Sequence, residues 1–287
     1  MLRDISKFFS VLFLVLLIFF SACQKEEEPQ LDVLQAKEII DLSYGDHPRH
    51  KMDVFLPENR SMENTRLLIW IHGGAWVDGD KGEFVNFKPW FEAVQENYAY
   101  VSLNYRLFDA FRGIDKFPAQ EEDIIRAMNF IKSKLSEWQV SEQVVLSGGS
   151  AGGHLALLHS YKHNEDGLVK VAAAVFPPTE LLTVGAVNPV IDLLMRQIIG
   201  SPQSNRQQYL DASPVNYVNS QSVPTTFFHG DADNVVPIAQ SYLLEDTLKA
   251  FGVPFYREYY PGQGHGFTDA TYRDMIAQIE RFISEQL

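Results

Sequence analysis

Short apolar runs alternate with helical periods over most of this 287-residue sequence. The runs LLIWIH, YAYVSLNY, VVLS, VAAAVF and TTFFHG are rich in Val, Ile, Phe and Tyr, and several are almost continuously apolar, as strands buried on both faces are. Helical spacing lies between them, at residues 83–97, 119–138, 151–163 and 237–251. This alternation predicts one α/β domain of about 250 residues, with a mostly parallel sheet covered by helices on both faces.

Further strands are expected at both ends of this alternation. EIIDLSY and HKMDVFL come first and should pair in an antiparallel way, and HKMDVFL alternates as a half-exposed strand does. FYREYY, at residues 255–260, precedes a terminal helix near residues 272–286. Together with the five apolar runs, these segments predict an eight-stranded sheet.

The first 22 residues have the pattern of a signal peptide. MLRDISK carries Arg3 and Lys7, and the apolar run FFSVLFLVLLIFF that follows is short for a membrane span. Cys23 is the only cysteine, and FSAC resembles the lipobox of bacterial lipoproteins, with Phe20 where leucine is usual. The resemblance implies cleavage before Cys23 and a lipid anchor on it, which places the protein outside the cytoplasm, on the periplasmic face or the cell surface. The alternative is an ordinary secretory signal.

An acidic, flexible tether is expected over residues 23–37, ahead of a folded domain at residues 38–287. Its QKEEE run resembles the export signal of surface lipoproteins in the Bacteroidetes, and a solvated linker is the alternative. The whole chain has a formal charge of -13, and 46% of its residues are hydrophobic, which is enough for a large core. A protein this acidic is repelled by phosphate backbones, so nucleic acid is excluded as an expected partner.

The stretch LSGGSAGGHLAL places Ser150 between an expected strand and an expected helix. Gly148 to Gly152 read G-x-S-x-G, the pattern of a sharp strand-to-helix turn that presents a serine hydroxyl at the edge of a sheet. Side chains at the flanking positions would collide with the strand or the helix. The alternative is a glycine-rich turn in which the serine only caps the helix.

Two further segments carry groups that suit a serine nucleophile. His72 to Trp76 read HGGAW after an expected strand, and small residues there let backbone amides approach a substrate oxygen. TTFFHGDADNVVP places Asp231 and Asp233 after another strand, and YPGQGHGF places His265 in a loop after the next. The order Ser, Asp, His is that of α/β-hydrolases.

With these motifs, the sequence resembles the α/β-hydrolase esterases, in particular the hormone-sensitive-lipase-like and feruloyl-esterase-like carboxylesterases. The resemblance covers residues 38–287 and includes the fragments LNYRL, FPAQEEDI and ASPVNYV. It implies an α/β-hydrolase fold and a serine hydrolase mechanism that needs no cofactor or metal. The HGGAW loop departs from the family's HGGG-type motif at Ala75, a small residue.

The chemistry of ester cleavage assigns a role to each candidate residue. His265 would accept the proton of Ser150, and a carboxylate would orient the imidazole. The family pattern H-G-x-x-D-x-x-V-P favours Asp233 over Asp231 for that carboxylate. The expected oxyanion hole consists of three backbone amides, those of Gly74, Ala75 and Ala151.

Other histidines and aromatic residues are assigned to packing or solvent. His154 is expected to be a packed helix residue, and His159 and His163 to lie on a solvated helix face, since no HExxH motif supports zinc. Six aromatic residues near the HGGAW and LNYR segments are expected mainly in the core, with some lining a pocket for an aromatic acyl group or a sugar face: Trp76, Phe84, Phe87, Trp90, Phe108 and Phe111. Residues 177–224 are long for a connection and suggest a small lid.

These observations favour a serine carboxylesterase for short-chain or aromatic acyl esters, with acetyl or feruloyl groups on polysaccharides as the substrate suggested by analogy. A lipid esterase, an arylformamidase or a peptidase would use the same residues. The non-enzyme alternative is a glycan-binding lipoprotein that keeps the fold without the chemistry. Retention of Ser150, Asp233 and His265 together favours an enzyme.

Overall fold

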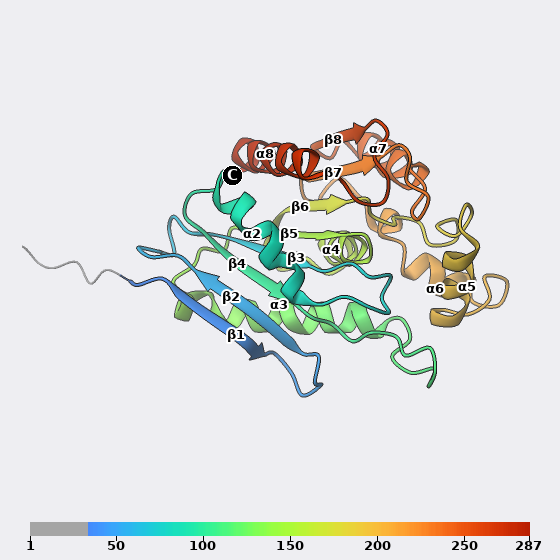
Figure 1. Cartoon of the computed structure of the whole chain (residues 1–287), viewed down its shortest axis with the longest axis horizontal. Helices are drawn as coiled ribbons and strands as arrows, with labels where there is room; N and C mark the ends of the chain where they lie inside the picture. The colour runs from blue at the N-terminus through green and yellow to red at the C-terminus, as the bar shows by residue number, and fades with distance from the viewer. Residues whose placement is uncertain (1–33) are drawn as a thin grey trace, which may run out of the picture. The chain divides into compact units, whose positions relative to one another are not determined.

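An eight-stranded sheet runs through residues 34–287, the part of the chain that this computed structural model describes (Figure 1). The strand order is β1-β2-β4-β3-β5-β6-β7-β8; β1 and β2 pair antiparallel, as do β2 and β4, and the other pairs are parallel. The strands are β1 Lys37–Ser43, β2 Lys51–Leu56, β3 Arg66–Ile71, β4 Tyr98–Leu103, β5 Val144–Gly149, β6 Val169–Val175, β7 Thr225–Gly230 and β8 Phe255–Tyr260. The predicted mostly parallel, eight-stranded α/β fold is confirmed.

The expected signal peptide, Cys23 and most of the expected tether lie outside the described residues. Within residues 34–287, none of the helices combines the length and the apolar character needed to cross a membrane.

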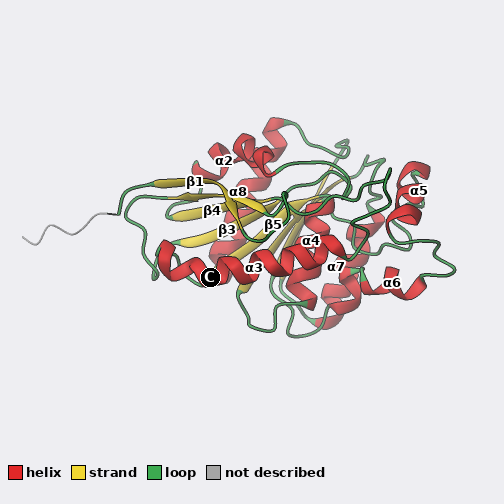
Figure 2. Ribbon diagram, turned by 90° about the horizontal axis from the view of Figure 1, so that it is seen from below, coloured by secondary structure: helices red, strands yellow, loops and turns green. Residues whose placement is uncertain are grey.

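Helices cover both faces of the sheet, as Figure 2 shows. One face carries α2 Phe84–Glu92 and α8 Asp269–Gln286; the other carries α3 Ala119–Trp138, α4 Ala151–Lys162 and α7 Ala239–Phe251. Strand β3 shows why its sequence is apolar throughout. Leu68 and Trp70 belong to the core beneath α2 and α8, whereas Ile69 and Ile71 belong to the core beneath α3 and α4. Alternate side chains of a strand point to opposite faces, so a strand covered twice must be apolar at every position.

One expected strand differs from its prediction. HKMDVFL was expected to be half-exposed, which is wrong, because every residue of β2 from Met52 to Leu56 is buried. The strand lies between β1 and β4 and is covered on both faces. Its polar member, Asp53, accepts a hydrogen bond from Lys81 Nζ at 2.9 Å. The polar residue that made the sequence of β2 alternate is therefore buried in an ion pair and does not face solvent.

The helix boundaries follow the predicted periods closely, with one exception. The period at residues 83–97 becomes a 3-10 turn, η1 Lys81–Glu83, and the short helix α2. Asn97 has a φ of 59°, a left-handed conformation that turns the chain into β4 and cannot continue a helix.

Residues 177–224, the expected lid, contain α5 Pro189–Ile198, α6 Arg206–Asp211 and the 3-10 turn η2 Pro214–Tyr217. Leu181, Ile191 and Met195 are buried in the same core as α3 and α4. Asn188 caps α5 and also donates a hydrogen bond to the carbonyl of Asn234 at 3.1 Å. The segment is thus packed on the sheet domain, and its movement as a lid stays a prediction.

The parallel pairing brings several loops to one edge of the sheet. Strands β3, β5, β7 and β8 run in the same direction, so the loops that follow them leave from the same edge. Those loops carry HGGAW, Ser150, the two aspartates and His265. Ligands of open α/β sheets bind at this carboxyl edge.

Candidate active site

Ser150 lies in the turn between β5 and α4, in a conformation that L-residues rarely adopt (φ 53°, ψ -121°). The turn is tight because the end of β3 packs against it. A Cβ atom on Gly148 would lie 2.6 Å from the carbonyl oxygen of Ile71, and one on Gly152 would lie 2.0 Å from the same atom. The Ser150 side chain makes no capping hydrogen bond to α4. The structure therefore does not support the alternative in which this serine is only a helix cap.

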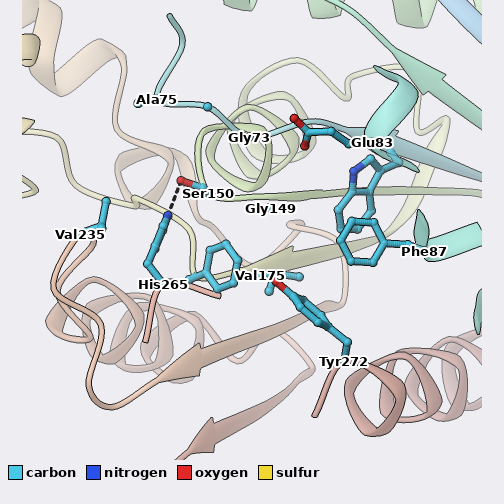
Figure 3. Close-up of a pocket in the computed structure, with 13 residues that line it drawn as sticks. Gly73, Ala75, Glu83, Phe87, Gly149, Ser150, Val175, Val235, His265 and Tyr272 are labelled. Atoms are coloured by element: carbon cyan, nitrogen blue, oxygen red, sulfur yellow. Dashed lines mark hydrogen bonds between the residues drawn. The ribbon is translucent and has the colours of Figure 1, made fainter. Parts of the chain in front are cut away.

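The hydroxyl of Ser150 begins a row of hydrogen bonds that ends at a carboxylate. Ser150 Oγ lies 2.9 Å from His265 Nε2, as Figure 3 shows, and His265 Nδ1 lies 2.7 Å from Asp233 Oδ2. The three residues come from loops after β5, β8 and β7, separated by up to 115 positions in the sequence. Asp231 is exposed and accepts a hydrogen bond from the amide of Gly262 at 2.6 Å. The structure thus brings Asp233, and not Asp231, to His265.

Asp233 is held in place by four donors. Its Oδ1 accepts the amides of Val235 and Val236 at 2.8 and 2.9 Å, and its Oδ2 lies 3.3 Å from His229 Nε2 as well as near His265. Burial by itself would raise the pKa of Asp233, but the hydrogen bonds from the two histidines hold the pKa well below its usual value. The carboxylate is therefore ionised and fixed, as a partner of an imidazolium must be.

His229 is a residue of this site that the sequence reasoning used only as part of a motif. Its Nε2 lies 3.0 Å from the carbonyl of Val236, and its Nδ1 lies 2.7 Å from Ser241 Oγ. A carbonyl only accepts, so Nε2 carries a hydrogen and faces Asp233 as a donor. The buried end of β7 therefore supplies a second histidine donor to the carboxylate of Asp233.

The loop of residues 73–79, here called the glycine loop, passes over Ser150. Gly74 has a φ of 100° and Ala75 a φ of 52°, so Ala75 adopts a conformation that glycine would take more easily. The amides of Gly74, Ala75 and Ala151 donate no hydrogen bond to other groups of residues 34–287. Gly73 lies close to Ser150, since a Cβ atom placed on Gly73 would be 3.4 Å from Ser150 Cβ. All three predicted oxyanion donors belong to the loop and the helix start that flank the serine.

A cavity of about 330 Å³ opens beside Ser150 and His265 (Figure 3). Aromatic and small apolar side chains form most of its walls: Trp70, Phe87, Val175, Phe176, Val235 and Tyr272. Of these, only Phe87 was among the aromatic residues singled out from the sequence. Trp70 lies two residues before His72 in the strand run LLIWIH, and Tyr272 lies at the start of the expected terminal helix, so the sequence assigned both to secondary structure and gave no signal of a position in the pocket. Phe176 follows β6, and its ring centroid lies 4.5 Å from that of His265.

Glu83 places a carboxylate in the wall of this cavity. Partial burial raises the pKa of Glu83, and the nearby carboxylates of Asp78 and Asp80 add to the rise. In Figure 3, Glu83 and Phe87 lie on the opposite side of Ser150 from His265 and Val235. The pocket therefore has an aromatic arm with one acidic group.

The other aromatic residues have different environments. Trp76, Phe84 and Phe108 are buried in the core, and Trp90 packs against Phe87 and Tyr272 at the edge of the pocket. The core position expected for Phe111 is wrong, because this residue is fully exposed.

The helix histidines are packed, with one correction. His154 is buried, and its Nε2 donates to the carbonyl of Ala212 at 2.7 Å, which confirms the predicted packing role. The solvated position predicted for His159 is wrong, because this residue is 7% exposed. His163 is half-buried and hydrogen-bonded to Glu121 at 2.6 Å. Among residues 34–287, no group of three or more His, Cys, Asp or Glu side chains is arranged to hold a metal ion.

Comparison with known proteins gives a consistent result. The family model of BD-FAE matches residues 52–248. A probable carboxylic ester hydrolase of Mycobacterium tuberculosis, LipM, is 30% identical over 228 residues, which is 73% of this chain and 51% of the relative. A kynurenine formamidase of Meyerozyma guilliermondii is 25% identical over 75% of this chain and 82% of its own. The chain spans about half the length of the first curated relatives that it matches.

Solved structures agree on the fold. A truncated carbohydrate esterase from gut microbiota superimposes with a TM-score of 0.74 at 20% identity, covering 87% of this chain and 97% of that one. At this level of identity the likeness concerns the fold. The family match covers well over half of the sequence, and it includes the glycine loop, Ser150 and Asp233. This chain therefore belongs to the BD-FAE family of α/β-hydrolase esterases.

Proposed function

We propose that this protein is a serine esterase in which Ser150 is the nucleophile, His265 the general base and Asp233 the group that orients His265. The observation that carries the proposal is the hydrogen-bonded row Ser150, His265, Asp233 at the wall of an open pocket, with distances of 2.9 and 2.7 Å. A glycan-binding protein without catalysis has no need of this row. Membership of an esterase family supports the same conclusion.

In the acylation step, Ser150 Oγ attacks the carbonyl carbon of the ester while its proton moves to His265 Nε2. The ionised Asp233 stabilises the imidazolium that results. The amides of Gly74, Ala75 and Ala151 receive the negative oxygen of the tetrahedral intermediate; one such donor contributes about 3 kcal/mol. The intermediate then collapses, the alcohol leaves with the proton from His265, and the acyl group remains on Ser150.

In the second half of the reaction, water replaces the alcohol. His265 Nε2 takes a proton from the water as it attacks the acyl carbon, and the same amides hold the oxygen again. Collapse releases the acid and returns the proton from His265 to Ser150. The first and the last proton transfers thus run across the contact of 2.9 Å between Ser150 Oγ and His265 Nε2, and the two between them join His265 Nε2 to the leaving alcohol and to the attacking water.

The arrangement of the pocket suggests which part of the ester lies where. His265 must reach the leaving oxygen, so the alcohol lies on the side of His265, and the acyl group extends the other way, towards Phe87 and Glu83 (Figure 3). We propose uncharged short or aromatic acyl groups for this arm. The fold likeness to a carbohydrate esterase supports a sugar or polysaccharide as the alcohol component.

A formamidase is the second candidate. The relative described as a kynurenine formamidase supports an aryl substrate with an N-formyl group, and the ring of Phe176, whose centroid lies 4.5 Å from that of His265, offers an aromatic surface on the leaving-group side. A formyl group needs little room, and the aromatic part would occupy the leaving-group side. This candidate uses the same nucleophile and base.

A panel of substrates separates these possibilities. We expect the purified domain to cleave p-nitrophenyl acetate and methyl ferulate, and to release acetate from acetylated xylan. Preference for N-formylkynurenine over every ester would favour the formamidase. Turnover confined to acyl chains of about ten carbons or more would contradict the short-acyl proposal and indicate a lipase.

Three variants test the assigned roles. Ser150→Ala should lower kcat by at least about a thousandfold without changing the unfolding midpoint, because the members of a triad act as a unit. Asp233→Asn should also be severe, since it leaves His265 in the wrong tautomer. Asp231→Asn is the matched control and should keep most of the activity. Full turnover in Ser150→Ala would contradict the mechanism.

A further inference from the structure

Arg49 joins four segments that meet behind the glycine loop. It lies in the turn between β1 and β2, and its Nε donates to the carbonyl of Tyr105 at 2.8 Å. Its Nη2 lies 2.9 Å from the carbonyl of Gly79, 3.1 Å from Asn104 Oδ1 and 3.1 Å from His72 Nε2. One guanidinium therefore links the turn before β2 to the ends of β3 and β4 and to the far end of the glycine loop. Arg49 is not one of the described residues that line the pocket.

His72, which precedes the loop, is held in one tautomer. Its Nδ1 lies 2.7 Å from the carbonyl oxygen of Gly73, which can only accept, so Nδ1 carries the hydrogen. Its Nε2 is then an acceptor, and Arg49 supplies the donor. Burial lowers the pKa of His72 to about 4, and the charge of Arg49 adds to this effect, so the ring is neutral at pH 7.

Tyr105 fixes the plane of the same ring. The two rings are stacked, with centroids 4.4 Å apart and an angle of 12° between them. The hydroxyl of Tyr105 donates to the carbonyls of His72 and Gly73 at 3.1 and 3.2 Å. Tyr105 therefore holds both the ring of His72 and the backbone where the glycine loop begins.

The two ends of the glycine loop, Gly73 and Gly79, lie close together beside the ring of His72. A Cβ atom on Gly79 would lie 2.4 Å from His72 Nδ1 and 2.6 Å from the carbonyl of Gly73. Between these ends, Ala75 and Trp76 have φ values of 52° and 63°, which are unfavourable for residues other than glycine. Such a conformation persists only when surrounding contacts hold it, and Arg49 contacts Gly79 at one end of the loop and His72, the residue that precedes the other end.

We propose that Arg49 is a positioning residue for the esterase reaction: its guanidinium keeps His72 in the Nδ1-H tautomer and closes the glycine loop, so that the amides of Gly74 and Ala75 face the oxygen of the tetrahedral intermediate. The inference rests on the proposed ester hydrolysis. Arg49 acts through the loop and does not touch the substrate.

The effect of losing Arg49 should appear in the transition state. Loss of one oxyanion donor lowers kcat by about 100-fold, so displacement of the loop should lower kcat by about 10- to 100-fold. KM should change less than about threefold, because the ground-state carbonyl makes little use of these donors. Trifluoromethyl ketones form a tetrahedral adduct with the serine, and their affinity should fall by the same factor as kcat/KM.

The experiment compares Arg49→Met, Arg49→Lys and a matched control, Arg60→Met. Arg60 also bonds backbone carbonyls, those of Trp138 and Pro57 at 2.8 and 3.0 Å, but it lies outside the site. Kinetics on p-nitrophenyl acetate, trifluoromethyl ketone inhibition and urea unfolding are measured for each. We expect Arg60→Met to lower the unfolding midpoint and keep kcat, Arg49→Met to lower kcat and inhibitor affinity in parallel, and Arg49→Lys to recover part of both.

Two results would overturn the proposal. One is an Arg49→Met enzyme that loses stability as Arg60→Met does but retains kcat and inhibitor affinity. The second result applies if Arg49→Met does not fold. In that case, a folded Arg49→Lys enzyme with unchanged kcat and unchanged inhibitor affinity would overturn the proposal. A wild-type protein inert towards every ester would instead contradict the proposed function itself.

Discussion

At the scale of single residues, Glu83 is the side chain that we expect to limit most directly which acyl groups the pocket accepts. Its carboxylate lines a cavity whose other walls are mainly apolar, and Asp78 and Asp80 lie near it. A negative group in the arm assigned to the acyl chain should repel acyl groups that end in a carboxylate. This gives a reason, from one residue, for the proposed preference for uncharged acyl groups.

Glu83→Gln should change selectivity between two esters of similar size. We expect kcat/KM for p-nitrophenyl hemisuccinate to rise about fivefold, equivalent to about 1 kcal/mol for a partly solvated charge pair, while p-nitrophenyl butyrate stays within about twofold. Glu92→Gln, on the exposed end of α2 and paired with Lys88, is the control. Equal changes for both esters would mean that Glu83 does not sense charge.

At the scale of elements, the turn between β5 and α4 is shaped by the neighbouring strand β3. The first turn of α4 packs so closely on the end of β3 that Gly152 has no space for a Cβ atom. Ser150 keeps its unusual conformation because this packing leaves the chain no other path. Ser150, the proposed nucleophile, is therefore positioned by two elements that are about 80 residues apart in the chain.

Gly152→Ala should be strongly destabilising, by about 3 kcal/mol, because its Cβ atom would lie 2.0 Å from the carbonyl oxygen of Ile71. Gly82→Ala is the control: the nearest atom is Asp80 Oδ1 at 3.2 Å, in an exposed turn. Urea unfolding measures both. A Gly152→Ala protein as stable as Gly82→Ala would show that β3 and α4 can separate at this point.

At the scale of the whole molecule, three buried histidines link stability to pH. Burial is the main cause that lowers the pKa of His72, His154 and His159 to about 4, against a usual value of 6.5. Between these values the unfolded chain binds protons that the folded chain does not, so folding free energy is lost as pH falls from about 6.5 towards 4. Below the usual pKa of aspartate, protonation of Asp233 removes further stability, because its folded pKa is lowered.

Urea unfolding at pH 7 and pH 5 tests this linkage. Each histidine should cost up to about 2 kcal/mol at pH 5, so the midpoint should fall clearly. His154→Gln should reduce the slope of stability against pH by about 1 kcal/mol per unit near pH 5. Leu155→Ala, a buried neighbour that does not titrate, should lower stability equally at both pH values. An unchanged slope in His154→Gln would show that this histidine is not the group involved.

The expected lipid anchor also concerns the whole molecule, and it depends on residues outside the described part. Cys23→Ser should release the protein from bacterial membranes and abolish labelling with a radioactive fatty acid, because the thiol is the site of attachment in a lipoprotein. Membrane fractionation with the unchanged protein in parallel measures this. Continued membrane association of Cys23→Ser would contradict the lipobox interpretation.

The sequence by itself determined the order of the eight strands and of the main helices between them, and it singled out Ser150, Asp233 and His265, the three residues for which we propose catalytic roles. Continuous apolar runs indicate strands covered on both faces, and glycines around Ser150 indicate a turn without room for side chains. The motifs are local, so their pattern is visible without coordinates. The family motif also favoured Asp233 over Asp231, and the contact between Asp233 and His265 agrees with that choice.

Only the tertiary structure decided how distant groups meet. The burial of β2 depends on the ion pair between Asp53 and Lys81, and the burial of His159 depends on packing that its own helix pattern does not show. The pocket walls come from strands, helices and loops across the chain, and Arg49 reaches the glycine loop from another turn. Periodicity reports the environment of one element, whereas these contacts depend on which elements pack together, and that is fixed only when the whole sheet has formed.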